Sequence, residues 1–236
     1  MRFAEPVEVV GVDGDDTLWR CQDAFDEAEV EVARLLAPYA DETQVQQALA
    51  RTERANLATY GFGVKSWTLN VLQTAQELAG GEAPVAPFLE LGRALLTGPV
   101  EVLEGAEEAV LALGRTHRVV LVTKGDLVDQ RRKLAASGLA GCFSHVEIVP
   151  DKSPAAYDEL LRFLGIPADR FLMVGNSEVS DVRPVLELGG WAVHVPYHTT
   201  WVLERAAEPV VHDRRLTVAS LSEVPALLHA DRPLRD

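Results

Sequence analysis

The hydrophobic positions near the start of the chain form a short run that ends in a cluster of acidic residues. Residues 7–12, Val-Glu-Val-Val-Gly-Val, are rich in β-branched side chains, which is typical of a strand. They lie between Pro6 and the sequence Asp-Gly-Asp-Asp at residues 13–16. The pattern predicts a strand over residues 7–12 that delivers a polar loop at its carboxyl end.

From residue 23 to about residue 96 the hydrophobic positions recur at helical spacing, and we find no strand pattern among them. The series begins with Phe25, Ala28, Val32 and Leu35, and similar sets follow further along. Glycines and prolines between residues 38 and 87 interrupt the pattern, as residues that break helices do. This segment is therefore predicted to form about four helices.

After Gly98 the pattern alternates between helix and strand. We expect strands over residues 119–122, 146–149, 171–174 and 191–195, helices over 106–113, 127–136, 154–164 and 182–188, and a last strand and helix after 216. This alternation predicts an α/β fold with a parallel sheet covered by helices on both faces. Since strand 7–12 needs partners in that sheet, residues 1–19 and 98–236 are predicted to form one core, with residues 20–97 as an inserted all-helical cap domain.

Composition excludes several classes of protein. The chain has 236 residues, 47% hydrophobic and 25% charged, which is typical of a folded globular protein. A net charge of −14 disfavours binding to a nucleic acid polymer or an anionic membrane. No apolar stretch is long enough to be a signal peptide or a membrane span, so we expect a cytoplasmic protein, monomeric or homodimeric, with Cys21 and Cys142 as reduced thiols.

Polar residues that could carry chemistry follow four of the predicted strands. They are the segments 13–17, 123–126, 151–154 and 175–181. Ligands bind at the carboxyl ends of the strands in open parallel sheets, so these segments mark a candidate site. The three carboxylates within residues 13–16 repel one another unless a cation or a proton relieves them. Leu18 and Ala24 stand where a calcium loop needs Gly and Glu, so oxygen donors here suit Mg²⁺ in a different kind of site.

These segments, taken in order, resemble the motifs of the haloacid dehalogenase-like (HAD) hydrolase superfamily. The resemblance covers nearly the whole core, and the helical insertion resembles the family's C1-type cap. It implies a Rossmann-like core, Mg²⁺ dependence and, most often, phosphatase activity through an aspartyl-phosphate. The matching residues are Asp13, Asp15 and Thr17 in the first motif, Thr123 in the second, Lys152 in the third, and Asn176 with Asp181 in the fourth.

The residue types agree with phosphate-ester hydrolysis. Asp13, first after the strand, is placed to act as nucleophile, and Asp15 to protonate the leaving oxygen and then deprotonate water, for which we expect a raised pKa. A hydroxyl on Thr123 and the ammonium of Lys152 would stabilise the charge of the transferred group. Phosphate binding is assigned to Thr17, Thr123, Lys124 and Lys152, and Mg²⁺ binding to Asp13, the backbone carbonyl of Asp15, Asn176 and Asp181, with the direct ligand among the last two left open.

Simpler roles exist for several of these residues. Thr17, Thr123 and Asp181 could be helix caps, and Lys152 a surface lysine before a helix. Asp16 and Asp126 are expected to be structural.

Two positions depart from the family pattern. Asn176 stands where Asp is frequent, which removes a negative charge from the metal site, and Lys124 follows the motif threonine where Asn is common. The six histidines show no zinc spacing, and there is no glycine-rich dinucleotide or nucleotide-triphosphate loop.

Specificity for a small phosphorylated metabolite is expected to come from the cap, which can close over the site. Trp19, Arg20 and Phe62 are candidate substrate residues, and Tyr60, Lys65 and Trp67 lie beside them. The competing functions are a 2-haloacid dehalogenase, a phosphotransferase or mutase, and a catalytically weak binding module of the same fold. Asp15 counts against the dehalogenase, since that branch of the family is not expected to have a carboxylic acid there, and Asn176 keeps the binding module open.

Overall fold

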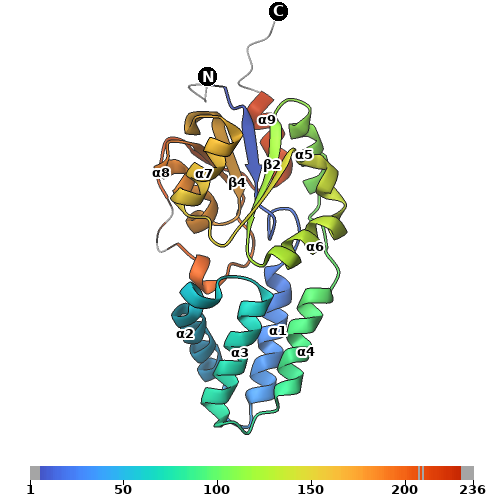
Figure 1. Cartoon of the computed structure of the whole chain (residues 1–236), viewed down its shortest axis with the longest axis vertical. Coiled ribbons are helices and arrows are strands. Elements are labelled where there is room, and N and C mark those ends of the chain that lie inside the picture. Colours follow the sequence, from blue (N-terminus) through green and yellow to red (C-terminus); the bar gives the residue numbers. More distant parts are fainter. Residues whose placement is uncertain (1–5, 207, 209, 230–236) are drawn as a thin grey trace, which may run out of the picture.

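A six-stranded parallel sheet forms the centre of the core in the computed structural model, which describes residues 6–206, 208 and 210–229 (Figure 1). The order is β3-β2-β1-β4-β5-β6. From β1 the chain adds β2 and β3 on one side and then returns to add β4, β5 and β6 on the other side, so the strand order reverses between the neighbours β1 and β4. Such a reversal opens a crevice at the carboxyl ends of the two strands. The strands are β1 Val9–Val12, β2 Arg118–Lys124, β3 His145–Val149, β4 Phe171–Gly175, β5 Trp191–His194 and β6 Arg215–Thr217.

Both faces of the sheet are buried, which explains why β1 is hydrophobic at every position. Val10 and Val12 pack on one face with helices α5 (Ala106–Gly114) and α9 (Val224–His229). Val9 packs on the other face with α7 (Pro154–Leu164), next to the short helix α8 (Arg183–Glu187). Side chains alternate between the faces of a strand, so one short run of valines serves both layers.

Four helices between β1 and α5 form a separate lobe at the carboxyl end of the sheet (Figure 1). The helices have their own hydrophobic core, centred on residues such as Val32, Val71 and Phe88. The predicted insertion of about four helices is therefore confirmed. They are α1 Gln22–Leu36, α2 Glu42–Tyr60, α3 Val64–Ala79 and α4 Val85–Thr97, and we call this lobe the cap.

The α/β fold with a parallel sheet and helical insertion agrees with the sequence prediction, and the differences are local. The first strand begins at Val9 instead of residue 7, and β2 is three residues longer than predicted. The helix predicted over 182–188 is α8, Arg183–Glu187, and a π-helical turn that was not predicted, Glu178–Val182, precedes it. Helix α6 (Leu127–Ser137) lies where a helix was predicted.

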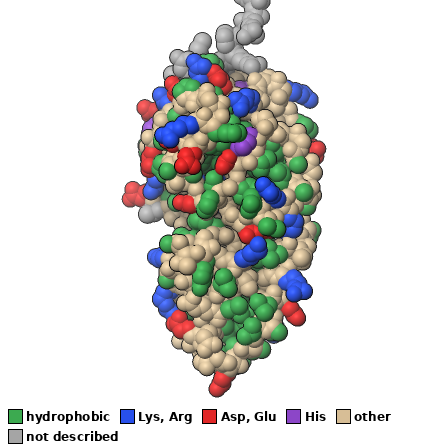
Figure 2. Space-filling model, in the orientation of Figure 1, with side chains coloured by type: hydrophobic (Ala, Val, Ile, Leu, Met, Phe, Trp, Pro, Cys, Tyr) green, Lys and Arg blue, Asp and Glu red, His purple; other side chains and the backbone are tan. Residues whose placement is uncertain are grey.

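The surface in Figure 2 carries basic and acidic side chains on both lobes, interspersed with hydrophobic ones. Both lobes therefore expose lysines and arginines on this face, although the chain has a net negative charge. Within the described residues, no helix combines the length and the apolar character needed to cross a membrane.

Candidate active site

The loop after β1 places Asp13 at the crevice between β1 and β4. The Asp13 N–H donates to the Val174 carbonyl at 2.9 Å, which continues the pairing of β1 with β4. Asp16 has a φ of 63°, and its carboxylate accepts the backbone N–H of Cys21 at 2.8 Å and of Gln22 at 3.0 Å. Asp16 therefore caps the start of α1, whereas Asp13 faces the crevice.

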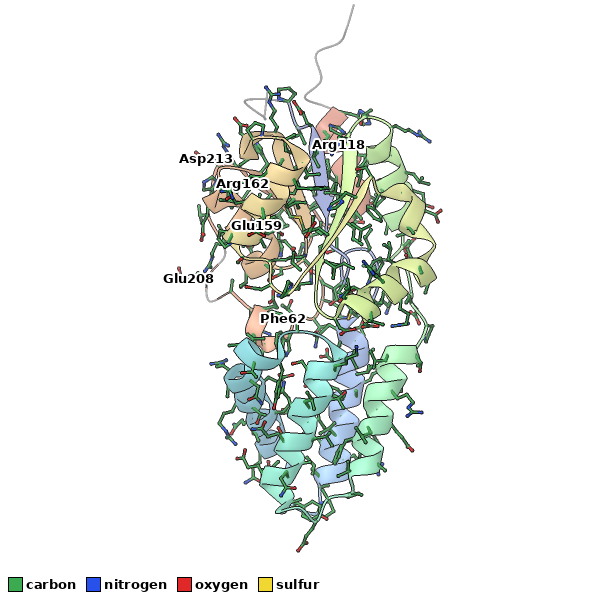
Figure 3. All side chains as sticks on the ribbon, viewed as in Figure 1. Phe62, Arg118, Glu159, Arg162, Glu208 and Asp213 are labelled. Carbon is green, nitrogen blue, oxygen red and sulfur yellow. The ribbon has the colours of Figure 1, made fainter. Side chains whose placement is uncertain are left out.

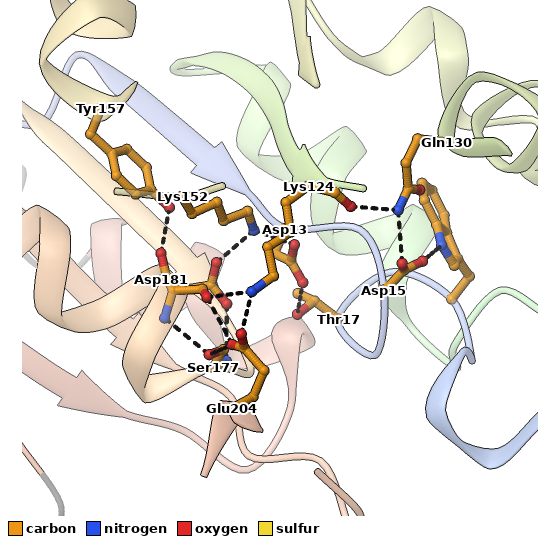
Figure 4. Close-up of polar contacts among 12 residues, drawn as sticks. Asp13, Asp15, Thr17, Lys124, Gln130, Lys152, Tyr157, Ser177, Asp181 and Glu204 are labelled. Atoms are coloured by element: carbon orange, nitrogen blue, oxygen red, sulfur yellow. Dashed lines mark hydrogen bonds and ion pairs between the residues drawn. The ribbon is translucent and has the colours of Figure 1, made fainter. Parts of the chain in front are cut away.

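Asp13 is one of two buried carboxylates that share a buried ammonium group (Figure 4). Lys152 donates to Asp13 Oδ1 and, at 2.7 Å, to Asp181 Oδ1, while Thr17 Oγ1 donates to Asp13 Oδ2 at 3.1 Å. Burial raises the pKa of Asp13 to about 7, although the charge of Lys152 opposes the shift. The structure thus brings four of the predicted site residues into direct contact, and Lys152 is not a surface lysine.

The π-helical turn explains how Asp181 reaches this cluster. The turn accommodates one more residue than an α-helical turn, and such turns are frequent at functional sites. The Ser177 N–H donates to Asp181 Oδ2 at 2.9 Å, and the Ser180 N–H donates to Ser177 Oγ at 3.0 Å. The hydroxyl of Tyr157 donates to the Ser180 carbonyl at 3.0 Å. The first of these bonds orients the Asp181 carboxylate, and the other two hold the backbone of the turn.

Gly175 at the end of β4 leaves the space that this carboxylate occupies. A methyl group there would overlap the Asp181 side chain, so we expect Gly175→Ala to displace Asp181 from Lys152 and lower kcat by about tenfold or more. The overpacking should also cost about 1–3 kcal/mol of unfolding free energy. Gly114→Ala is the matched control, because its methyl meets no atom within 4 Å. Equal thermal stability and turnover in both variants would contradict this role for Gly175.

Asp15 lies on the other side of the loop, in contact with helix α6. Its carboxylate accepts from Gln130 Nε2 at 2.8 Å (Figure 4). It also accepts from Trp19 Nε1 at 2.6 Å and from Lys133 Nζ at 2.9 and 3.0 Å. Burial alone would raise the pKa of Asp15, but the Lys133 ammonium and these hydrogen bonds outweigh burial and lower the pKa. The expected raised pKa is therefore wrong. The arrangement favours Asp15 as a base over Asp15 as an acid.

Thr123 and Lys124 at the end of β2 add two more polar side chains to the lining of the crevice. Thr123 is buried with its hydroxyl near Gly14. The Lys124 ammonium donates to Ser180 Oγ at 2.7 Å, pairs with Glu204, and lies 3.8 Å from the centre of the Phe62 ring. Lys124 thus connects the core with the cap.

The segment after β5 crosses from the core to the cap, and we call residues 196–204 the β5 strap. Its side chains contact α1 and α2: Tyr197 and His198 bond to Asp23, Thr199 to Asp26, and Trp201 Nε1 donates to Glu53 at 3.0 Å. At its end Glu204 accepts from Ser177, Ser180 and Lys124. The strap therefore forms one wall of the site, between the cap helices and the residues that follow β4.

A cavity between the lobes joins these groups. It is lined by residues of the β1 loop, the ends of β2 and β4, helices α1 to α3, α6 and the β5 strap. Phe62 lies where the cap meets the core (Figure 3) and lines this cavity, as does Trp67. Trp19 is buried beneath the loop, and Arg20 is exposed beside Asp23 and Glu101, so neither lines the cavity. Among the other cap candidates, Tyr60 and Lys65 also lie outside the lining.

Several residues of the site were not singled out from the sequence. Gln130 and Lys133 lie on a helix that the periodicity predicts, but nothing local to that helix shows that it faces Asp15. Glu29, Glu53 and Glu204 lie in segments where acidic residues are common. The position of α6 against the loop is a tertiary feature, so the sequence pattern carries no signal for these five side chains.

The candidate magnesium donors are all oxygen atoms, which is the chemistry that Mg²⁺ prefers. They are the carboxylates of Asp13 and Asp181, the amide oxygen of Asn176, which lines the cavity, and the backbone carbonyl of Asp15. Each carboxylate oxygen retains a lone pair beyond its protein hydrogen bond. No group of three Asp, Glu, His or Cys side chains is arranged as a metal site in the described part of the chain. The donor set fits Mg²⁺ with two carboxylates and two neutral oxygens.

A parallel sheet with a buried aspartate after its first strand and a helical cap above it defines a class of hydrolases. A family model for the haloacid dehalogenase-like hydrolases matches residues 7–189. A haloacid dehalogenase-like family hydrolase from Xanthomonas campestris is 40% identical, with a TM-score of 0.85 over 96% of this chain and 92% of that chain. The chain therefore belongs to the haloacid dehalogenase-like hydrolase family. A comparison with curated proteins finds no match.

More distant structures share the fold. L-2-haloacid dehalogenase from Xanthobacter autotrophicus, with chloropropionic acid covalently bound, is 16% identical, with a TM-score of 0.67 over 96% of this chain and 100% of that chain. A HAD hydrolase from Bacillus subtilis bound to magnesium is 18% identical, with a TM-score of 0.64 over 95% of this chain and 99% of that chain. At these identities the likeness extends to the fold alone.

Proposed function

We propose that this hydrolase is a Mg²⁺-dependent phosphatase that acts on a small phosphate monoester. The observation that carries the proposal is Asp15, a carboxylate two residues beyond the candidate nucleophile that lines the same cavity. Lys133 and Gln130 keep Asp15 ionised, and an ionised carboxylate can accept a proton from water.

The proposed reaction has two displacements at phosphorus. Asp13 Oδ attacks the phosphoryl group, the bond from phosphorus to the ester oxygen breaks, and the leaving oxygen takes a proton from solvent water. Water then attacks the aspartyl-phosphate at phosphorus while Asp15 accepts the proton of that water, Asp13 is regenerated, and Asp15 returns its proton to solvent. Lys152 and the Thr123 hydroxyl stabilise the charge on the phosphoryl oxygens. Mg²⁺ bound by the oxygen donors would neutralise further phosphoryl charge.

A dehalogenase is the second candidate, and it is supported by the dehalogenase with a covalently bound chloropropionic acid among the similar structures. In that chemistry Asp13 attacks the carbon that bears the halogen, halide leaves, and water hydrolyses the resulting ester. The Asp13, Lys152 and Thr17 arrangement serves this reaction equally well. The two functions differ in the role of Asp15 and in the need for a metal.

The deciding experiment measures release of phosphate from an aryl phosphate and of halide from 2-chloropropionate, with Mg²⁺ or with EDTA. We expect Mg²⁺-dependent phosphate release that falls by about 100-fold or more in Asp15→Asn. Halide release without Mg²⁺, retained in Asp15→Asn, would replace the phosphatase by the dehalogenase. Neither product from folded protein would contradict both functions and favour the binding module.

A single turnover in ¹⁸O-labelled water separates the two mechanisms independently. Attack of water on phosphorus puts the label into phosphate, whereas attack on the ester carbonyl puts it into the Asp13 carboxylate. We therefore expect labelled phosphate and an unlabelled peptide containing Asp13 by mass spectrometry.

A further inference from the structure

The cavity between the lobes contains more negative charge than its cations balance. Nine carboxylates and three lysines line it. Seven of the nine carboxylates have a cation or a capped helix start as partner: Asp13 and Asp181 with Lys152, Asp15 and Asp129 with Lys133, Asp126 with Lys65, Glu204 with Lys124, and Asp16 with the backbone of α1. Glu29 and Glu53 pair with no lysine, arginine or histidine among the described residues.

These two glutamates lie close together on the cap side of the cavity, Glu29 on α1 and Glu53 on α2. Glu53 is only 4% exposed and has one neutral donor, the indole N–H of Trp201. Burial raises the pKa of each glutamate to about 7, and the charge of Glu29 adds to the shift at Glu53. Two neighbouring carboxylates, Glu53 buried and Glu29 partly buried, repel each other unless a cation or a proton lies between them.

The surrounding walls add an observation that points to a polar ligand. The indole N–H of Trp67, 4% exposed, lies beside Glu29 as a donor and lowers the pKa of that carboxyl. Gln130, 3% exposed, lacks a partner for Oε1 among the described residues. Its Nε2 donates to Asp15 and to the Lys124 carbonyl, so the amide cannot be reversed without placing oxygen against oxygen. Both residues line the cavity.

Aromatic rings complete the surroundings of the two carboxylates. Trp67 packs edge to face against Phe25, with ring centres 5.8 Å apart, and Trp201 packs edge to face against Phe62 at 5.9 Å. All four rings line the cavity. Carboxylates beside aromatic rings suit an organic cation, because carboxylates supply charge and aromatic rings attract ammonium groups, as Phe62 already does with Lys124.

We propose that Glu29 and Glu53 form a cation subsite that binds the protonated amine of an aminoalkyl phosphate, with its phosphoryl group toward Asp13. The inference rests on the proposed phosphatase function and specifies its substrate class. The ammonium would satisfy the two carboxylates, and its positive charge would offset the acidic cavity that otherwise repels a phosphate ester. The cap then selects the leaving group, while the core performs the chemistry.

The test compares ω-aminoalkyl phosphates of two to five carbons with alkyl phosphates that carry a methyl group in place of the ammonium. For at least one chain length we expect kcat/KM to favour the amine by about tenfold or more, the value of a hydrogen bond to a charged group. Glu29→Gln and Glu53→Gln should each reduce that preference, mainly through a higher KM for the amine. Glu27→Gln, an exposed residue of α1, is the matched control and should leave the preference unchanged.

The remaining outcomes separate the subsite from the reaction. Hydrolysis of both series with no preference for the amine, or a preference that persists in both glutamine variants, would overturn the subsite and leave the phosphatase intact. If no ester is hydrolysed, the proposed function fails, and calorimetric titration with free amino alcohols of the same lengths decides the subsite. Binding that is lost in the double glutamine variant supports the subsite, and no binding to the wild-type protein overturns it.

Discussion

Asp13→Asn is expected to lower kcat by at least about three orders of magnitude while the protein remains folded. The amide cannot form the covalent bond, but it keeps an acceptor for Thr17. Lys152 keeps its partner Asp181, so no buried cation is left alone in the variant. Turnover in single-turnover and steady-state assays, with thermal unfolding as the measure of folding, checks this expectation.

Asp16→Asn is the matched control for that experiment. Asp16 lies three residues further on, is buried to a similar extent, and burial raises its pKa to about 7 as for Asp13. It caps α1 rather than facing Lys152, and Asn caps helices about as well as Asp. We expect its turnover to stay within about threefold of the wild type. Activity that survives in Asp13→Asn, or is lost equally in both variants, would exclude Asp13 as the nucleophile.

Lys152→Met is expected to destabilise the fold as well as stop the reaction. Removing the ammonium leaves Asp13 and Asp181 as buried carboxylates without a cation, which costs about 3–5 kcal/mol in comparable cases. For a chain of this length that corresponds to a fall in Tm of about 6–20 °C. The loss should be larger at pH 8 than at pH 5, because protonation of Asp13, whose pKa is raised to about 7 by burial, relieves the repulsion as the pH falls.

The comparison for Lys152 is Lys65→Met. Lys65 also pairs with an aspartate, Asp126, but its side chain is 54% exposed, so we expect a change below about 1 kcal/mol. Thermal unfolding of the two variants at both pH values distinguishes a buried pair from an exposed one. Equal losses, or a Lys152 effect that does not depend on pH, would show that the cluster does not hold its charges as described.

The core was largely predictable because its signals are local. Each strand is a hydrophobic run, and the residues that follow β1, β3 and β4 meet at one edge because parallel strands end there together. Asp13, Lys152 and Asp181 follow strands, and their order along the chain together with the resemblance to the family's motifs marked them as site residues. The structure places them in contact. The π-helical turn was not predicted, since its five residues are too few to show a helical period.

The environment of Asp15 was predicted incorrectly for a physical reason. The sequence shows three neighbouring carboxylates, and repulsion among them suggests a raised pKa. The structure adds Lys133 and Gln130 from a helix more than a hundred residues away, and their charge and hydrogen bonds reverse the shift. Trp19 and Arg20 were assigned to the substrate because they follow the loop, but the turn of the loop buries one and exposes the other.

The β5 strap has a consequence for how the two lobes unfold. The cap is joined to the core by two chain connections, and the strap adds side-chain contacts from Tyr197, Thr199 and Trp201 to α1 and α2. Melting of the cap alone would release these contacts and expose groups on the core, so part of the folding free energy belongs to both lobes. The stability of the cap therefore depends in part on residues that lie about a hundred positions beyond the end of the cap.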